Sequence, residues 1–134
     1  MYCLDTDVLS AVLRPRPVIA LVRRLAMTPP QEQFTTSITL GELLFGARRK
    51  GSVALERRIR ELVPTGGAVL PFDRAAAEVY AAVRTDLERS GRPLAEPDLR
   101  IASIALSRDL TLVTGNVRHF ARVPDLRVED WLRA

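Results

Sequence analysis

Short apolar runs alternate with longer segments of helical periodicity along this chain, and that alternation restricts its possible folds more than any other feature. The runs predict five strands, at Tyr2–Leu4, Phe34–Ser37, Ala68–Phe72, Leu110–Val113 and Leu126–Val128. Strands that alternate with helices in sequence favour a mostly parallel sheet covered on both faces. We therefore expect an α/β fold in which a central sheet of about five strands is flanked by helices on both faces.

Six segments between the predicted strands carry apolar residues at spacings of three and four, which is typical of helices packed on a core. They cover residues 7–13, 18–25, 40–50, 53–63, 73–87 and 97–107. Proline and glycine mark the breaks between them, including a predicted turn at Pro64–Gly67. Asp73 and Glu96 stand where helix N-caps are expected.

The length and composition are those of an ordinary globular domain. With 134 residues, 47% of them apolar and 27% charged, the chain is long enough to bury a core, and we expect residues 1–134 to form one domain. No apolar stretch is long enough to cross a bilayer, and Asp5 and Asp7 interrupt the place where a signal peptide would be apolar. Cys3 is the single cysteine, so no internal disulfide forms. These features lead us to expect a cytoplasmic protein without a membrane partner.

The formal net charge is +4, and all but one of the 20 basic residues are arginine, the exception being Lys50. Arginine binds phosphate groups through a planar, bidentate guanidinium, so this surplus is compatible with a nucleic-acid partner. A compositional bias towards arginine, with charges that only solvate the helices, is the simpler explanation of the charge taken alone. A nucleic-acid function therefore needs the support of a specific site.

Three acidic residues follow predicted loops, and each has a structural explanation as well as a functional one. Asp5 comes directly after the first predicted strand, where open α/β sheets bind ligands, but a turn or cap acid would also stand there. Thr39–Glu42 matches a capping box, in which Glu42 would only close the start of a helix. Asp98 follows Pro97 in a first helical turn, where an acid complements the helix dipole.

Taken together, these three acids indicate a metal site. Helix starts that follow parallel strands gather along one edge of a sheet, so Asp5, Glu42 and Asp98 are expected to lie close together. Carboxylates in apolar surroundings repel one another unless a cation lies between them, and oxygen ligands suit Mg²⁺ or Mn²⁺. A usual zinc site is excluded, because the chain has one histidine and one cysteine. Carboxylate-bound Mg²⁺ activates water and neutralises a phosphodiester, so with the arginines the expected substrate is nucleic acid.

A further polar loop follows the strand predicted at Leu110–Val113. Thr114 and Asn116 are placed there to hold water or to support an acid, although an ordinary turn containing Asn and Gly explains them as well. Thr6, beside the first acid, is a further supporting residue. His119 is the single histidine, and we interpret it as a surface side chain rather than a general base, with its role left open.

These motifs, in this order, resemble those of the PIN-domain ribonucleases, and in particular of the VapC toxins of type II toxin–antitoxin pairs. The matching stretches run along essentially the whole chain, and they are Leu4–Ser10, Gly41–Leu43 with Gly46 and Ala47, Asp98–Ala102, Leu112–Asn116 with Phe120, and Arg122–Leu126. No single motif is specific to the family, but their order in a chain of this length is. The resemblance implies a single PIN domain with a parallel sheet and flanking helices.

The resemblance also implies an activity. By position, Asp5, Glu42 and Asp98 match the acidic catalytic and metal-binding residues of the family, which cleaves RNA with Mg²⁺ or Mn²⁺ and a metal-activated water. Asn116 stands where many members carry a fourth acid, and this departure leaves the number of ions open. Asp7 stands where asparagine is frequent, and it would be a helper or a cap residue.

The partners implied by the resemblance are an RNA substrate, a second copy of the chain, and a VapB-type antitoxin. The antitoxin would form a hetero-oligomer with this chain, occlude the site and carry the contacts to operator DNA. The candidate residues for RNA contact are Arg48, Arg49 and Arg100.

Two other functions stay open from the residues alone. Asp5 followed by Asp7 also resembles the first motif of haloacid-dehalogenase-type phosphohydrolases, in which Asp5 would be the nucleophile. That chemistry needs a lysine and a later acidic pair, but Lys50 stands at a helix end and Glu129–Asp130 lies outside any predicted strand end.

A non-catalytic RNA- or partner-binding domain would instead use paired arginines, such as those at 23–24, 48–49 and 57–58. Binding of that kind survives a chelator and the loss of Asp98, whereas cleavage does not.

Overall fold

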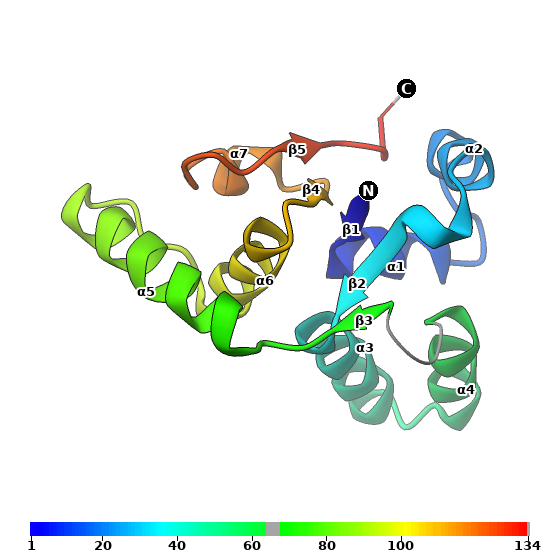
Figure 1. Ribbon diagram of the computed structural model, residues 1–134. Coiled ribbons are helices and arrows are strands. Elements are labelled where there is room, and N and C mark those ends of the chain that lie inside the picture. Colours follow the sequence, from blue (N-terminus) through cyan, green and yellow to red (C-terminus); the bar gives the residue numbers. More distant parts are fainter. Residues whose placement is uncertain (64–67, 134) are drawn as a thin grey trace.

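The computed structural model describes residues 1–63 and 68–133, so the turn predicted at Pro64–Gly67 lies outside the described residues. The described chain contains one sheet of five parallel strands in the order β3-β2-β1-β4-β5 (Figure 1). The strands are β1 (Tyr2–Leu4), β2 (Gln33–Thr36), β3 (Val69–Leu70), β4 (Thr111–Val113) and β5 (Val128–Glu129). The parallel sheet predicted from the alternation of strands and helices is therefore confirmed.

The N-terminal strand β1 lies at the centre of this sheet. It pairs in parallel with β2 on one side and with β4 on the other, where Leu4 lies opposite Val113. The strands that follow β1 in sequence extend towards one edge of the sheet, and the last two strands extend towards the other edge. In an open parallel sheet such a reversal leaves a crevice beyond the carboxyl ends of the two central strands, which is the usual place of a binding site.

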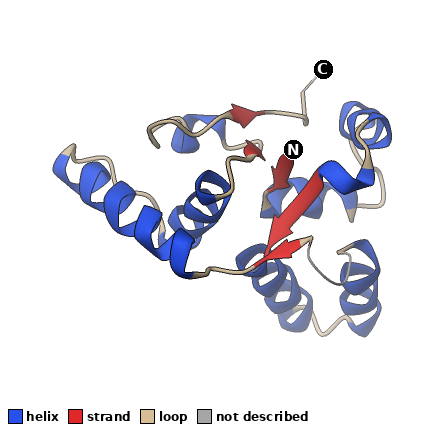
Figure 2. Ribbon diagram, in the orientation of Figure 1, coloured by secondary structure: helices blue, strands red, loops and turns tan. Residues whose placement is uncertain are grey.

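Helices cover the sheet on both faces, as the sequence predicts. They are α1 (Thr6–Val12), α2 (Ile19–Met27), α3 (Ser37–Arg49), α4 (Val53–Leu62), α5 (Arg74–Arg89), α6 (Glu96–Ser107) and α7 (Val117–Phe120), with a short 3-10 turn at Pro30–Glu32. In Figure 1, α5 and α6 lie on one side of the strands, and α2 and α4 lie on the other. Figure 2 shows the strands enclosed between these two groups of helices.

Two apolar cores lie against the two faces of the sheet, because successive residues of a strand point to opposite faces. Cys3 and Leu112 face a core that they share with α5, α6 and Phe120 of α7. Leu4 and Val113 face a second core, which they share with α1, α2, α3 and α4. Each central strand thus contributes buried residues to both cores, as is usual for strands of a parallel sheet.

Helix caps account for the main differences from the predicted boundaries. The helix α3 begins at Ser37, earlier than predicted, because Thr36 is its N-cap and accepts a hydrogen bond from the Thr39 N–H at 3.0 Å. Asp73 is confirmed as the N-cap of α5. The expectation that Glu96 caps a helix is wrong, since it is the first residue of α6 and no side chain caps that helix.

The C-terminal part differs from the prediction in two further details. The single-turn helix α7 was not predicted, and the last strand begins at Val128 rather than spanning Leu126–Val128. That strand is nevertheless the edge strand beside β4, as expected. Among the helices of residues 1–63 and 68–133, none combines the length and the apolar composition needed to cross a bilayer.

Candidate active site

The candidate site lies where β1 and β4 end side by side. Asp5 follows β1, and its backbone N–H donates to the Val113 carbonyl at 2.9 Å, which joins the two strand ends. Asp5 is only 5% exposed, and both of its carboxylate oxygens accept hydrogen bonds. Oδ1 accepts from the Thr6 N–H at 2.8 Å, and Oδ2 accepts from the Thr114 hydroxyl at 2.8 Å. Asp5 is therefore the N-cap of α1 and at the same time is fixed in the crevice.

Asp7 holds the loop that follows β4. It lies in the first turn of α1, after the N-cap, so the alternative that it is a cap is wrong. Its Oδ2 accepts a hydrogen bond from the Gly115 N–H at 2.8 Å. A Cβ atom at Gly115 would lie 2.6 Å from Leu132 Cδ1 and 2.9 Å from Asp7 Oδ2, so the backbone approaches closely because this residue is glycine. Asp7 thus connects α1 to the loop between β4 and α7.

Glu42 does not close a capping box. Because α3 begins at Ser37, Glu42 lies in the second turn of the helix, and its Oε1 accepts a hydrogen bond from the Thr6 hydroxyl at 2.6 Å. Thr6 therefore contacts two of the three predicted acids, Asp5 through its backbone N–H and Glu42 through its hydroxyl. The hydroxyl of Thr39, which is fully buried, lies 3.2 Å from that of Thr6 and extends this network into the core.

Asp98 completes the group from a third helix. It lies half-buried in the first turn of α6. Burial is the largest cause that raises the pKa of the Asp98 carboxyl above its ordinary value, and the negative charges of Glu42 and Asp7 raise it further, while His119 opposes the rise. Interactions between charges are largely screened beyond about 10 Å at ordinary ionic strength. Asp98 of α6 therefore lies within the range of the charges of Glu42 on α3 and Asp7 on α1.

The pKa of the Asp5 carboxyl is also raised by neighbouring negative charges. Burial raises the pKa of Asp5 to about 7, the charges of Asp7 and Asp98 add to the rise, and the hydrogen bonds from Thr114 and Thr6 oppose it. A buried carboxylate with so high a pKa costs free energy whenever it is ionised. Thr6 thus connects Asp5 and Glu42 at the end of β1, and the charge of Asp98 acts on Asp5.

The donor chemistry of this crevice suits a hard divalent cation. Within residues 1–63 and 68–133, no three histidine, cysteine, aspartate or glutamate side chains are arranged to ligate one ion directly. Mg²⁺ does not need such a cage, because it keeps several waters and is commonly bound through one or two carboxylates and a substrate phosphate. The raised pKa of Asp5 fits as well, since a cation relieves the repulsion among the acids. The residues present therefore fit Mg²⁺ or Mn²⁺.

Asn116 and His119 form a pair at the rim of the crevice. The side-chain oxygen of Asn116 is hydrogen-bonded to Nδ1 of His119, and its backbone N–H donates to the Thr114 hydroxyl at 3.0 Å. His119 is exposed, as expected for a surface side chain, and its charge lowers the pKa of Asp98. The sequence analysis named both residues but did not predict that their side chains contact each other. The available signal was the spacing of Asn116 and His119, which lie one helical turn apart.

The three arginines predicted to contact RNA are exposed and engaged with neighbouring residues. Arg48 forms an ion pair with Glu56 at 3.0 Å, and Arg100 forms one with Glu96 at 3.3 Å. Arg49 lies over an aromatic ring of its own helix. Exposed ion pairs of this kind contribute little free energy, so they leave the guanidinium groups able to exchange partners. Contact of these arginines with RNA stays a prediction.

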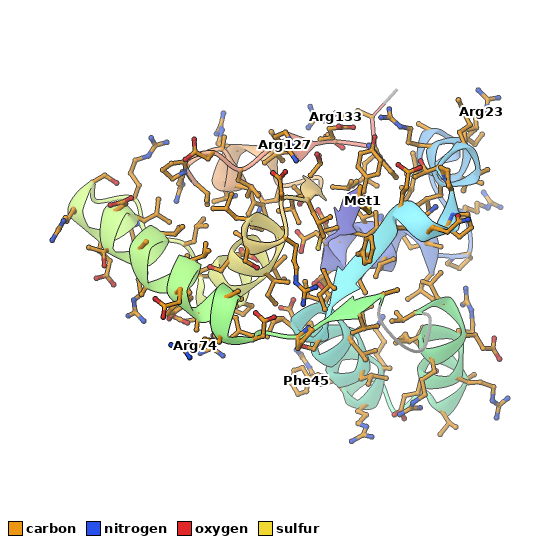
Figure 3. All side chains as sticks on the ribbon, in the orientation of Figure 1. Met1, Arg23, Phe45, Arg74, Arg127 and Arg133 are labelled. Atoms are coloured by element: carbon orange, nitrogen blue, oxygen red, sulfur yellow. The ribbon has the colours of Figure 1, made fainter. Side chains whose placement is uncertain are left out.

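Other arginines are distributed over several elements. Figure 3 shows labelled examples projecting from the surface, namely Arg23 on α2, Arg74 on α5, and Arg127 and Arg133 on either side of β5. Of the paired arginines in the binding alternative, Arg24 forms an ion pair with Glu129 at 2.9 Å, and Arg58 donates to the Leu13 carbonyl at 3.1 Å. Because these charges lie on separate elements, charge alone does not mark an RNA-binding face.

The groups required by the phosphohydrolase alternative are placed elsewhere. Lys50 is the exposed C-cap of α3. The expectation that Glu129 lies outside any strand end is wrong, because Glu129 ends β5. Its carboxylate, however, is engaged by Arg24 at 2.9 Å and by the Trp131 indole N–H at 3.0 Å. The alternative in which Asp5 is a covalent nucleophile is therefore not favoured.

Comparison with known proteins shows what this chain is similar to. A family model described as the PIN domain matches residues 2–126. The tRNA(fMet)-specific endonuclease VapC of Shigella flexneri is 35% identical over 130 residues, which cover 97% of each chain. The structure of FitAcB from Neisseria gonorrhoeae has a TM-score of 0.87 at 28% identity and covers 100% of each chain. The structure of DNA-bound VapBC from Salmonella typhimurium has a TM-score of 0.82 at 33% identity and covers 97% of each chain.

Proposed function

The chain belongs to the PIN-domain family, and from this membership we propose that it is the ribonuclease toxin of a type II toxin–antitoxin pair. Its activity is that of a metal-dependent endoribonuclease, which hydrolyses RNA phosphodiester bonds. The observation that carries the proposal is that Thr6 contacts both Asp5 and Glu42 at the end of β1, with Asp98 within the range of their charges. We take residues 1–134 as one PIN domain.

We assign Asp5 and Asp98 as the residues that hold a Mg²⁺ or Mn²⁺ ion. The support is their raised pKa, which marks two carboxyls whose ionised forms a cation would stabilise. When bound, the ion supplies Lewis acidity that makes water more nucleophilic and offsets the negative charge of the phosphodiester. We assign Glu42 either to complete the ligand set or to position the attacking water. Attack on phosphorus then leaves a 5′-phosphate on the product.

The contribution of the remaining site residues is to hold these acids in place. The Thr114 hydroxyl and the Thr6 N–H bind the two oxygens of Asp5, and the Thr6 hydroxyl binds Glu42. Carboxylates that are already fixed need little reorganisation during the reaction, which is how preorganised sites lower a barrier. Arg48, Arg49 and Arg100 are assigned to guide the RNA backbone towards them. Asn116, which is engaged by His119, is assigned a supporting role.

The partners in this proposal are RNA, a second copy of the chain and a VapB-type antitoxin. The solved relatives include complexes named VapBC and FitAcB, one of them bound to DNA. By analogy, the antitoxin would occlude the crevice and would carry the contacts to operator DNA. A cytoplasmic location is part of the proposal, because the substrate is cellular RNA. A small neighbouring reading frame for a DNA-binding protein would support the pairing.

The test is an RNA cleavage assay with three arms, namely Mg²⁺, EDTA, and the Asp98→Asn variant with Mg²⁺. We expect cleavage in the first arm only, because Asp98→Asn keeps the shape of the side chain and removes its charge. The matched control is Asp86→Asn, an exposed acid on α5 that should cleave like the unchanged protein.

Undiminished cleavage by Asp98→Asn contradicts the assigned mechanism. RNA binding without cleavage in every arm would favour the non-catalytic binding domain. Phosphate trapped covalently on Asp5 would favour the phosphohydrolase.

A further inference from the structure

A groove next to the acids shares Thr6 and Glu42 with the mechanism proposed above, but its other residues have no part in that mechanism. It lies between α1, α3 and α4 and has a volume of about 380 Å³. We call it the α1–α3 groove and define it by Thr6, Ser10, Arg14, Glu42, Gly46 and Lys50. Thr6 and Glu42, which are hydrogen-bonded to each other, line both this groove and the catalytic crevice. The groove is therefore continuous with the proposed site of cleavage.

The helix α3 lines this groove with residues that are four apart in sequence. Glu42, Gly46 and Lys50 fall on one face of the helix, since residues at this spacing lie one above another. The two turns between Glu42 and Lys50 correspond to about 12 Å along the helix axis. This face of α3 therefore carries Glu42 at the crevice and Lys50 at the C-terminal end of the helix.

The facing helix α1 repeats the arrangement. Thr6 and Ser10 lie one turn apart on α1, and Arg14 follows the end of the helix. On α3 the lining residues thus run from Glu42 at the crevice to Lys50. On α1 they run from Thr6 at the crevice to Arg14. Two cations from different helices border the same groove at its far part.

Both of these cations are available to bind an anion. None of the ion pairs among the described residues involves Arg14 or Lys50, whereas Arg48 of the same region is paired with Glu56. Lys50 is the only lysine of the chain, and both residues are exposed. An arginine fork and a lysine ammonium together match the oxygens of a phosphate group.

The middle of the groove is open because of Gly46. A Cβ atom built on this residue meets no atom within 4 Å, although glycine is a poor choice inside a helix. The walls beside it include the apolar side chains of Leu13 and Leu55. Apolar walls with polar groups at both ends are typical of sites that take a small organic group with a charged part. A nucleotide has this composition, with a flat base and a phosphate.

We propose that the α1–α3 groove binds the nucleotide adjacent to the scissile bond, with Arg14 and Lys50 holding its phosphate. The inference rests on the proposed function, because it takes RNA as the substrate and the crevice as the place of cleavage. Single-stranded RNA is the form that fits, since its bases can leave the stack and contact side chains. Arg14 and Lys50 are then substrate-positioning residues.

The first experiment measures the binding of a labelled single-stranded oligoribonucleotide in EDTA, by fluorescence anisotropy over a range of salt concentrations. Arg14→Ala and Lys50→Ala should each weaken binding several-fold and reduce the slope of log K against log salt by about 0.7, the value for one lost phosphate contact on a single strand. Lys50→Arg should keep most of the affinity. The matched control is Arg89→Ala, an exposed basic residue in the last turn of α5.

The second experiment obstructs the groove itself. Gly46→Glu places a bulky negative side chain in open space, so it should raise KM about tenfold and leave the melting temperature unchanged or higher. The control is Ala82→Glu, which adds the same charge at an exposed position of α5. Its KM should stay at the value of the unchanged protein.

The outcomes separate this inference from the proposed function. If the unchanged protein neither binds nor cleaves RNA, the proposed function fails and the inference fails with it. If the unchanged protein cleaves RNA and the variants at Arg14, Gly46 and Lys50 keep its KM and salt slope, the function stands and the groove proposal is overturned. Variants that keep RNA binding but lose a co-expressed antitoxin would assign the groove to a protein partner, and would also overturn the proposal.

Discussion

At the scale of single residues, the site depends on hydroxyl groups that connect different helices. Thr6 joins Asp5 of α1 to Glu42 of α3, and Thr114 joins the end of β4 to Asp5. Among the described residues, no buried side-chain nitrogen or oxygen lacks a hydrogen-bond partner. Two carboxylates that would be costly to bury are thus stabilised by neutral donors, which leave their negative charge in place for a cation.

Replacing Thr6 by valine tests this role. Thr6→Val keeps the shape of the side chain and removes the hydroxyl that Glu42 accepts from. We expect kcat to fall about tenfold, which corresponds to the roughly 1.4 kcal/mol of one charge-assisted hydrogen bond, with a much smaller change in stability. Steady-state cleavage kinetics measure the effect. Thr6→Ser should restore kcat, and a Thr6→Val enzyme with unchanged kcat would contradict the role.

Gly115 provides a second test at this scale. An added Cβ would lie 2.9 Å from Asp7 Oδ2 and 2.6 Å from Leu132 Cδ1, so Gly115→Ala must displace both the Asp7 carboxylate and the leucine side chain. We expect a loss of about 1–3 kcal/mol in the free energy of unfolding, measured with urea. Gly41→Ala on α3, where an added Cβ meets nothing within 4 Å, should instead stabilise the protein by up to about 1 kcal/mol. Equal effects of the two substitutions would show that the close approach is unimportant.

At the scale of elements, the strands were predictable from short apolar runs and most helices from apolar periodicity, because both patterns are local. The start of α3 was not, since Thr36 and Thr39 are both good N-caps and each begins a plausible helix. The sequence pattern predicted that Glu42 belongs to a capping box. Because the N-cap is Thr36, Glu42 lies in the second turn of α3, where it accepts a hydrogen bond from Thr6. The turn α7 is too short for periodicity to reveal. The influence of its His119 on the pKa of Asp98 depends on packing between distant segments.

The cap of α3 can be tested directly. Thr36 is fully buried, and Thr36→Ala removes the oxygen that accepts the Thr39 N–H at 3.0 Å. We expect the free energy of unfolding to fall by about 1–2 kcal/mol, the usual effect of losing a threonine cap. Urea denaturation gives the value. Thr36→Ser keeps the hydroxyl and should recover most of the loss, and a serine variant as unstable as the alanine variant would attribute the effect to the lost methyl group.

At the scale of the whole molecule, the acids make the metal-free protein sensitive to pH. The pKa of Asp5 is about 7 in the folded state against 3.8 for an ordinary aspartate, so between these values the folded state binds more protons than the unfolded state. The free energy of unfolding therefore falls as pH rises from about 4 to 7, by up to about 4 kcal/mol from this residue. The raised pKa of Asp98 acts in the same direction.

Urea denaturation in EDTA at pH 5 and pH 8 tests this expectation. The unchanged protein should be less stable at pH 8, and Asp5→Asn should show a much smaller difference between the two pH values. Mg²⁺ added at pH 8 should recover stability, because an ion that binds only the folded state stabilises it. A metal-free protein that is equally stable at both values would contradict the raised pKa of Asp5.

The central place of β1 has a consequence for synthesis of the chain on the ribosome. Residues 2–4 are made long before residues 111–113, which pair with them on one side, and the Asp5 N–H donates to the carbonyl of Val113. A nascent polypeptide that ends before β4 cannot complete the sheet or fix Asp5 through Thr114. Such long-range pairing also slows folding. The nuclease site is therefore complete only after β4 and Thr114 have left the ribosome.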